Sequence, residues 1–143
     1  MYFFHLQNDM FTSQDDLDHF LKMLYKENIL TRDSHTIFLG KTGKVGKTYK
    51  KFQCDLPSGV KGFRVKVHIP VLLKKLNILQ MEEGMETSHL CHIKHCINPE
   101  HLNAEPHHIN NNRQTCVNYR IELSDNSFCT GHGDYPRCIP KDD

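Results

Sequence analysis

Cysteine and histidine are concentrated in residues 88–116 of this chain, which read SHLCHIKHCINPEHLNAEPHHINNNRQTC. These 29 residues hold three cysteines and six histidines. Cys91, Cys96 and His101 follow one another with four intervening residues at each step, a spacing that suits three ligands of one zinc ion. A chain of 143 residues with 38% hydrophobic residues and no tryptophan can build only a modest core, so we expect bound metal to supply part of its order.

The six cysteines could instead form three disulfides in a secreted protein. However, the N-terminal sequence MYFFHLQNDMF lacks the basic start and the long apolar run of a signal peptide, and no segment approaches the length of a membrane span. Seven of the eleven histidines fall between His89 and His132, among the cysteines. We therefore favour zinc over disulfides and expect an intracellular protein with no membrane partner.

The first predicted zinc site needs a fourth ligand, because a structural zinc ion is held by four protein groups in a closed tetrahedron. Cys54 is the favoured candidate, since it lies in a predicted β region and thiolate-rich sites are the commoner structural pattern. His92 and His95 are local competitors within the loop.

A second zinc site is predicted in the C-terminal part of the chain, where cysteine and histidine recur in a turn-rich sequence. Its four ligands would be Cys116, Cys129, His132 and Cys138. In the alternative interpretation, Cys116 and Cys129 are small buried residues and the tail is loose.

Helix and strand signals predict an α+β fold. Apolar residues recur at helical spacing over 13–29, where Ser13 and Asp16 resemble a capping box. Residues 35–79 favour antiparallel β structure that leads into a helix beginning at Pro70. We predict an N-terminal helical segment over 1–34 and a zinc-binding domain over 35–143, in one compact unit. Residues 88–143 are so rich in Cys, His, Asn and Pro that we predict no long regular element there.

Basic residues are concentrated over 40–75, where ten Lys and Arg accompany one acid, although the whole chain has a net charge of +1. The segment GFRVKVHI alternates, with apolar residues from Phe63 to Ile69 on one face and basic residues on the other. Such a block suits contact with a phosphate backbone, but a solvated lysine-rich hairpin explains the charge equally well. The candidate nucleic-acid-binding residues are Lys41, Lys44, Lys47, Lys50, Lys51, Arg64, Lys66 and His68.

His89 and Asn110 remain outside both predicted zinc sites. In an extended segment His89 shares a face with Cys91, so it could be a zinc ligand, a buried histidine or a general base. Asn110 offers a neutral oxygen of the kind that Mg²⁺ accepts, within a plausible helix. A polar surface or a helix cap would explain residues 110–112 equally well. Spacing alone does not distinguish these interpretations from a metal ligand.

Together these residues resemble the His-Cys box of homing endonucleases, which belong to the ββα-metal (His-Me finger) nuclease superfamily. The matching positions are Ser88, His89, Leu90, Cys91, Cys96, Asn98, Pro99, His101, Leu102, Asn110 and Cys116. The match is strong over about a third of the chain and weaker from about Cys54 to Cys138. The resemblance implies a small zinc-stabilised ββα-metal fold with two structural zinc ions. It also implies that His89 is the general base, that Asn110 holds a catalytic Mg²⁺, and that Arg64 contacts the scissile phosphate, with Lys66 and His68 as alternatives.

The function that this resemblance implies is Mg²⁺-dependent hydrolysis of DNA, leaving 5′-phosphate and 3′-hydroxyl ends. The alternative is a catalytically inactive, zinc-stabilised module that binds nucleic acid. RNA as the substrate and a homodimeric state both stay open. A DNA substrate would place the protein in the nucleus or otherwise with DNA.

Overall fold

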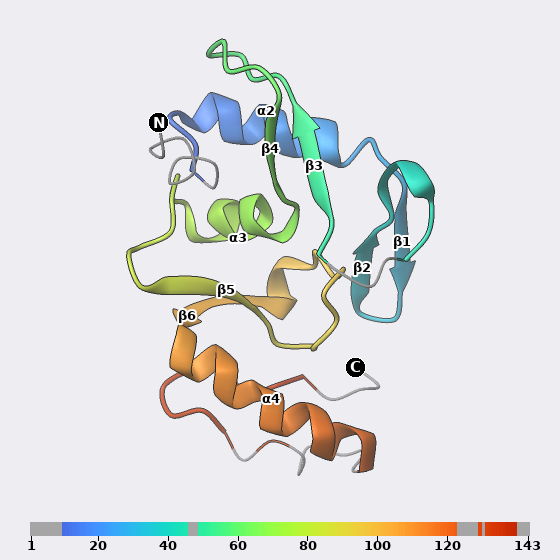
Figure 1. The fold of residues 1–143 in the computed structure, drawn as a ribbon, viewed down its shortest axis with the longest axis vertical. Coiled ribbons are helices and arrows are strands. Elements are labelled where there is room, and N and C mark those ends of the chain that lie inside the picture. The colour runs from blue at the N-terminus through green and yellow to red at the C-terminus, as the bar shows by residue number, and fades with distance from the viewer. Residues whose placement is uncertain (1–9, 46–48, 123–128, 130, 140–143) are drawn as a thin grey trace.

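The computed structural model describes residues 10–45, 49–122, 129 and 131–139, which combine helices with antiparallel strand pairs (Figure 1). The predicted α+β class is confirmed. In chain order the elements are α2 (Gln14–Leu24), β1 (Ile29–Arg32), β2 (His35–Phe38), η1 (Gly40–Thr42), β3 (Lys51–Cys54), β4 (Phe63–Lys66), α3 (His68–Leu76), β5 (Met85–His89), η2 (Pro99–His101), β6 (Leu102–Pro106) and α4 (His107–Glu122).

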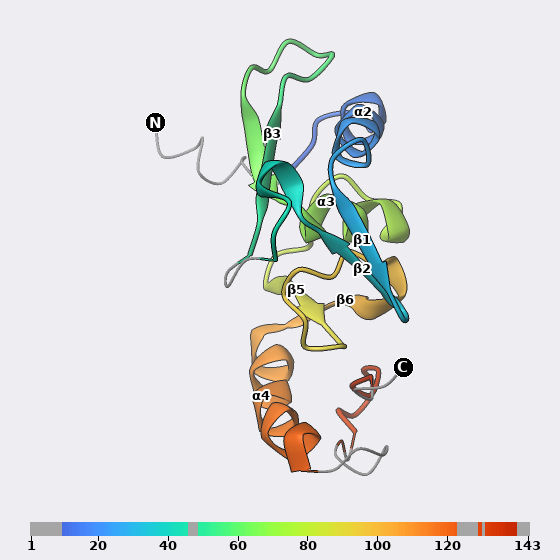
Figure 2. The same cartoon turned by 90° about the vertical axis from the view of Figure 1, so that its right-hand side faces the viewer.

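The strands form the two-stranded pairs β1–β2, β3–β4 and β5–β6, each antiparallel. In the last pair His89 lies opposite Leu102, and α4 starts directly after β6 at His107. Both views show α4 extending away from this pair, with the C-terminal segment running back beside it (Figures 1 and 2). This strand–strand–helix unit is the ββα arrangement that the resemblance implies.

Helix α2 lies where a helix was predicted, but it ends at Leu24 rather than at residue 29. The Ser13 side chain accepts a hydrogen bond from the backbone N–H of Asp16 at 3.2 Å and so caps the first turn. The Asp16 carboxylate does not complete a capping box. It turns to the loop between β3 and β4, where it accepts from the Ser58 N–H at 3.1 Å and from the Ser58 hydroxyl at 2.5 Å.

The core lies between α2, α3 and the β3–β4 pair, and its centre is aromatic. The Phe63 ring lies 4.8 Å from Phe11 and 5.8 Å from Phe20, centroid to centroid. Side chains from α3 and from β6 complete the core, so the ββα unit shares it. Other buried members are Leu17, Leu21, Leu24, Phe38, Leu56, Val65, Val67, Val71, Leu72, Leu73, Ile97 and Leu102.

Two sequence predictions are wrong at the level of elements. The alternating strand ends at Lys66, because the chain already turns into α3 at His68, so Pro70 is the third helical residue and not the first. In addition, α4 is a 16-residue helix within the stretch where no long element was expected. The division at residue 34 stays a prediction; β1 and β2 pair across it. Within the described residues, no helix is long and apolar enough to cross a membrane.

Replacing Asp16 by alanine should destabilise the protein, because the buried carboxylate joins α2 to the β3–β4 loop. Each of the two hydrogen bonds to this carboxylate contributes about 1.5–3 kcal/mol, so we expect the free energy of unfolding to fall by at least about 3 kcal/mol. Urea unfolding of zinc-loaded protein measures this loss. Asp15→Ala, which changes an exposed carboxylate in the same turn, is the matched control; equal midpoints for the two variants would contradict the assignment.

Candidate functional site

Four buried side chains converge beside the loop between β5 and β6. They are His35, Cys91, Cys96 and His101, whose nitrogen and sulfur atoms all lie within 4.8 Å of one another. The Cys96 sulfur is 3.5 Å from Nδ1 of His101. Tetrahedral zinc with bond lengths of about 2.0–2.3 Å needs ligand atoms about 3.3–3.8 Å apart, so this donor set fits zinc with only small adjustments.

The fourth member of this cluster is His35, and Cys54 is not part of it. Cys54 ends β3, where it pairs with Phe63 and packs half-buried against the hydrophobic core. His35 reaches the cluster because β2 runs along the loop: the Ile97 N–H donates to Thr36 O at 2.6 Å, and the Phe38 N–H donates to His95 O. His92 and His95 are not members either.

The second cluster joins α4 to the C-terminal segment and has the predicted membership of Cys116, Cys129, His132 and Cys138. Nε2 of His132 lies 3.5 Å from the Cys116 sulfur and 3.4 Å from the Cys138 sulfur. Burial raises the pKa of Cys138 to about 12, so its thiolate needs a nearby cation. These distances and soft donors also fit a tetrahedral zinc ion.

A buried ion pair connects the second cluster to the ββα unit. Arg113 of α4 donates two hydrogen bonds to the carboxylate of Glu105 in β6, at 2.7 and 2.8 Å. Its remaining terminal nitrogen lies 3.3 Å from the Cys138 sulfur. Both members of the pair are almost fully buried, and such a bidentate pair fixes one orientation. The register of α4 on β6 is therefore set by Arg113.

His89 ends β5 and lies outside both clusters. Its Nε2 is 3.1 Å from the carbonyl oxygen of Cys96. Because a carbonyl only accepts hydrogen bonds, Nε2 carries the proton and Nδ1 keeps a lone pair. Burial lowers the pKa of His89 to about 4, so the ring is neutral near pH 7 and can accept a proton.

Asn110 lies in the first turns of α4, and its carboxamide faces β5. Its Nδ2 donates to Oε1 of Glu86 at 2.7 Å. His89 and Asn110 line the same small cavity, of about 140 Å³, with Tyr49, Lys94 and Gln114 among the other lining residues. Asn111 and Asn112 are exposed and do not line it. The structure thus brings together the two residues that the resemblance implies for catalysis.

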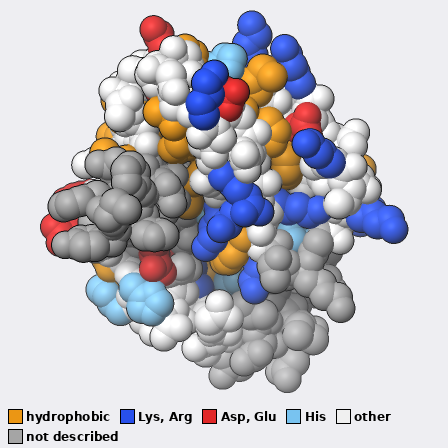
Figure 3. Space-filling model, turned by 45° about the horizontal axis from the view of Figure 1, so that its top comes forward, with side chains coloured by type: hydrophobic (Ala, Val, Ile, Leu, Met, Phe, Trp, Pro, Cys, Tyr) orange, Lys and Arg blue, Asp and Glu red, His pale blue; other side chains and the backbone are white. Residues whose placement is uncertain are grey.

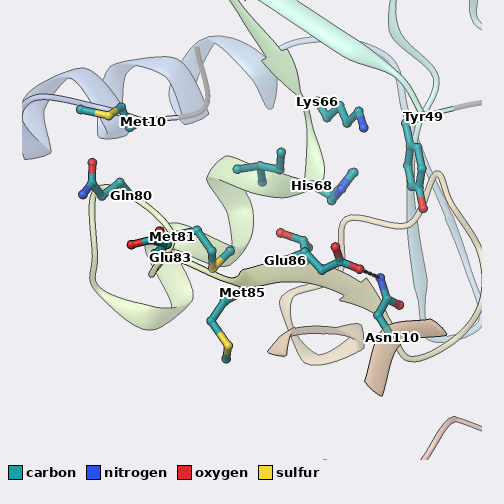
Figure 4. A pocket seen from close by; sticks show the side chains of 12 residues that line it. Met10, Tyr49, Lys66, His68, Gln80, Met81, Glu83, Met85, Glu86 and Asn110 are labelled. Atoms are coloured by element: carbon teal, nitrogen blue, oxygen red, sulfur yellow. Dashed lines mark hydrogen bonds between the residues drawn. The ribbon is translucent and has the colours of Figure 1, made fainter. Parts of the chain in front are cut away.

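A larger cavity, of about 480 Å³, adjoins Asn110 on the side of β4 and α3 (Figure 4). Lys66 and His68 line it, whereas Arg64 does not. Arg64 lies exposed on β4 opposite Gln53, further from the ββα unit than Lys66. The phosphate contact stays a prediction, for which the position of Lys66 in the cavity lining is more favourable than that of Arg64.

Tyr49 lines both cavities and contacts His89. Its ring stacks on His89 with centroids 5.7 Å apart, and its hydroxyl end points toward the Glu86–Asn110 pair (Figure 4). The ammonium groups of Lys66 and Lys94 lie 4.9 and 5.6 Å from the ring centroid. Burial, and then the charge of Glu86, raise the pKa of Tyr49, so the hydroxyl keeps its proton.

His68 is not on the basic face where it was predicted. It is buried at the start of α3, with its ring 4.6 Å from that of His89. Burial, with smaller effects of His89 and Lys66, lowers the pKa of His68 to about 2. A ring that is neutral near pH 7 cannot attract phosphate by charge, and His68 instead packs against the ring of His89.

The remaining basic candidates differ in how free their side chains are to contact nucleic acid. Lys41, Lys44, Lys51 and Arg64 are exposed, and Lys and Arg side chains gather across the face drawn in Figure 3. Lys50 is committed to its own loop, because its ammonium donates to Leu39 O, Lys44 O and the Thr42 hydroxyl at 3.0–3.1 Å. Lys47 lies outside the described residues.

Four residues of the site were missed in the sequence: His35, Tyr49, Glu86 and Lys94. His35 and Tyr49 come from distant segments, and their approach depends on tertiary contacts that leave no local pattern. Glu86 left no local signal either, because a side chain three positions before His89 lies on the opposite face of a regular strand.

A comparison with protein families bears on the whole arrangement. The family model described as the zinc-binding loop region of homing endonuclease matches residues 43–141, more than half of the chain. The matched segment contains His89, Asn110 and all of the second cluster, although His35 precedes it. No curated protein and no solved structure matches the chain. With its ββα unit and two buried Cys/His clusters, the chain belongs to the family defined by the zinc-binding loop region of homing endonucleases.

Proposed function

We propose that this protein is a Mg²⁺-dependent DNA endonuclease with His89 as the general base. The observation that carries the proposal is the shared cavity of His89 and Asn110, one at the end of β5 and the other in the first turns of α4. An imidazole lone pair and a carboxamide thus face one space that is open to solvent. A phosphodiester and the attacking water would meet there.

The residues around this cavity have separate roles in the proposed reaction. Nδ1 of His89 accepts a proton from the attacking water, while the bond from Nε2 to Cys96 O holds the ring in that tautomer. The same hydrogen bond to the Cys96 carbonyl would also stabilise the positive charge that develops on the imidazole when it takes up the proton. Asn110 would hold the Mg²⁺ ion, which when bound stabilises negative charge on the phosphate and on the leaving oxygen. Lys66 would contact the phosphate in place of Arg64.

Both Cys/His clusters would hold structural zinc, since each is closed by four protein donors and offers no open position for substrate. The exposed lysines of residues 40–66 would contact the DNA backbone. The same surface could bind RNA, and dimerisation and a location with DNA follow from the resemblance alone; these stay predictions. A zinc-stabilised binding module without cleavage is the competing function, and it leaves the pairing of His89 with Asn110 unexplained.

His89→Ala should lower the nicking rate at least about 100-fold, because general base catalysis contributes roughly 10²–10⁴-fold. Zinc content and DNA affinity should be retained, since His89 lies outside both clusters. Single-turnover nicking of supercoiled plasmid at saturating Mg²⁺ measures the rate. His108→Ala, which removes an exposed histidine of α4, is the matched control. If His89→Ala nicks as fast as this control, His89 is not the base.

Lys66→Ala and Arg64→Ala should have different effects, because only Lys66 lines the larger cavity. Loss of a charge that stabilises the transition state should lower kcat by about 100-fold for Lys66→Ala. Arg64→Ala should mainly weaken DNA binding and reduce its salt dependence. Cleavage rates at saturating DNA, together with binding at several salt concentrations, separate the two. The reverse pattern would restore Arg64 as the phosphate contact.

His35→Ala should reduce bound zinc from two ions to one per chain and lower the melting temperature, because it opens the first of the two clusters. Cys54→Ser should keep both ions, since Cys54 packs against the core. Metal analysis of the purified chains, with thermal melting, gives both values. Two zinc ions in His35→Ala and one in Cys54→Ser would reverse the assignment.

A further inference from the structure

The carboxylate of Glu86 holds two side chains at the start of α4. Oε1 accepts from Nδ2 of Asn110 at 2.7 Å, which is the length of a charge-assisted hydrogen bond. Nδ1 of His107 lies 3.0 and 3.2 Å from the two carboxylate oxygens. Glu86 itself is half-buried in β5, three residues before His89. One strand therefore carries both the proposed base and the group that contacts Asn110.

This contact decides which end of the Asn110 carboxamide faces the cavity. An ionised carboxylate only accepts hydrogen bonds, so the NH₂ group must face Glu86. The two ends of a carboxamide point in different directions, and Oδ1 is left on the side away from Glu86, as Figure 4 shows. A carboxamide without such a partner can turn over at little steric cost, because its oxygen and nitrogen ends are similar in size. The turned group would present N–H donors, which repel a cation.

We propose that Glu86 is a positioning residue for the metal site: it fixes the Asn110 carboxamide with its oxygen toward the cavity shared with His89. The inference rests on the proposed function for its consequence in catalysis. His107 steadies the carboxylate from the other side, and it is exposed, so it acts as a secondary support. The role requires a side chain at position 86 that accepts hydrogen bonds and cannot donate them, which is true of a carboxylate and not of a carboxamide.

The effect on metal affinity should match that of other residues that orient a ligand, whose removal costs roughly 10- to 100-fold. Glu86→Ala should weaken binding of Mn²⁺, used as a spectroscopic substitute for Mg²⁺, by about that factor. Glu86→Gln should weaken this binding less, because its side-chain oxygen can still accept from Asn110, although its NH₂ group can also donate to Oδ1 and turn the carboxamide over. Glu83→Ala is the matched control, since Glu83 lines the same larger cavity in the segment before β5.

Electron paramagnetic resonance titration of zinc-loaded, full-length protein with Mn²⁺ measures the affinity. Nuclear magnetic resonance of ¹⁵N-labelled protein without Mn²⁺ reports the Asn110 side-chain NH₂ directly. We expect one strongly shifted, slowly exchanging amide proton in the wild type, a smaller shift in Glu86→Gln, and its loss in Glu86→Ala. Nicking by Glu86→Ala should recover at high Mg²⁺, which shows that the affinity and not the chemical step has changed. Zinc content and melting temperature verify that each variant is folded.

Two results would overturn the inference: wild-type Mn²⁺ affinity and amide resonances in Glu86→Ala, or a loss of Mn²⁺ affinity in Glu86→Ala with the Asn110 amide resonances unchanged. The second result would mean that charge, and not orientation, is the contribution of Glu86. The amide spectrum also separates this inference from the proposed function. A wild-type protein that cleaves no DNA refutes the nuclease, whereas its Asn110 resonances still report whether Glu86 orients the carboxamide.

Discussion

The hydrogen bond from Nε2 of His89 to the carbonyl oxygen of Cys96 is the contact on which the proposed chemistry depends. It fixes the tautomer, and with it the nitrogen that can accept a proton. The Cys96 side chain lies in the first Cys/His cluster, and the neighbouring backbone pairs with β2. Zinc in that cluster would hold the loop and so hold the base. Cys96 would therefore have two roles: its sulfur would bind the structural zinc ion, and its carbonyl would orient the proposed general base.

The other half of the site is held by a different set of contacts. Asn110 takes its position from α4, whose register on β6 is set by the buried pair of Arg113 and Glu105. The same arginine contacts Cys138, so the C-terminal segment and the second cluster stabilise that register. A small protein with a limited core could position the two proposed catalytic side chains in this way, because metal-binding clusters would hold the loop and the helix that carry them.

Local sequence patterns predicted much of this architecture. The periodicity of α2, the β3–β4 pair and the membership of the second cluster all agree with the structure, because each depends on residues close together in the chain. The fourth member of the first cluster, His35, could not be predicted from local sequence patterns. His35 lies 56 positions before Cys91, and the preference for thiolates pointed to Cys54, whose place is in the core. Arg64 and Lys66 share one face of a strand, so the alternating pattern could not show that Lys66 lines the larger cavity and Arg64 does not.

The most direct measurement is incubation of the zinc-loaded, full-length protein with supercoiled plasmid and Mg²⁺, followed by treatment with DNA ligase. The proposed reaction predicts nicks that appear only when Mg²⁺ is added, that disappear in EDTA and return when Mg²⁺ alone is restored. It also predicts that ligase reseals them, because the ends are 5′-phosphate and 3′-hydroxyl. Plasmid that is bound by the protein but stays supercoiled at every Mg²⁺ concentration would contradict the account.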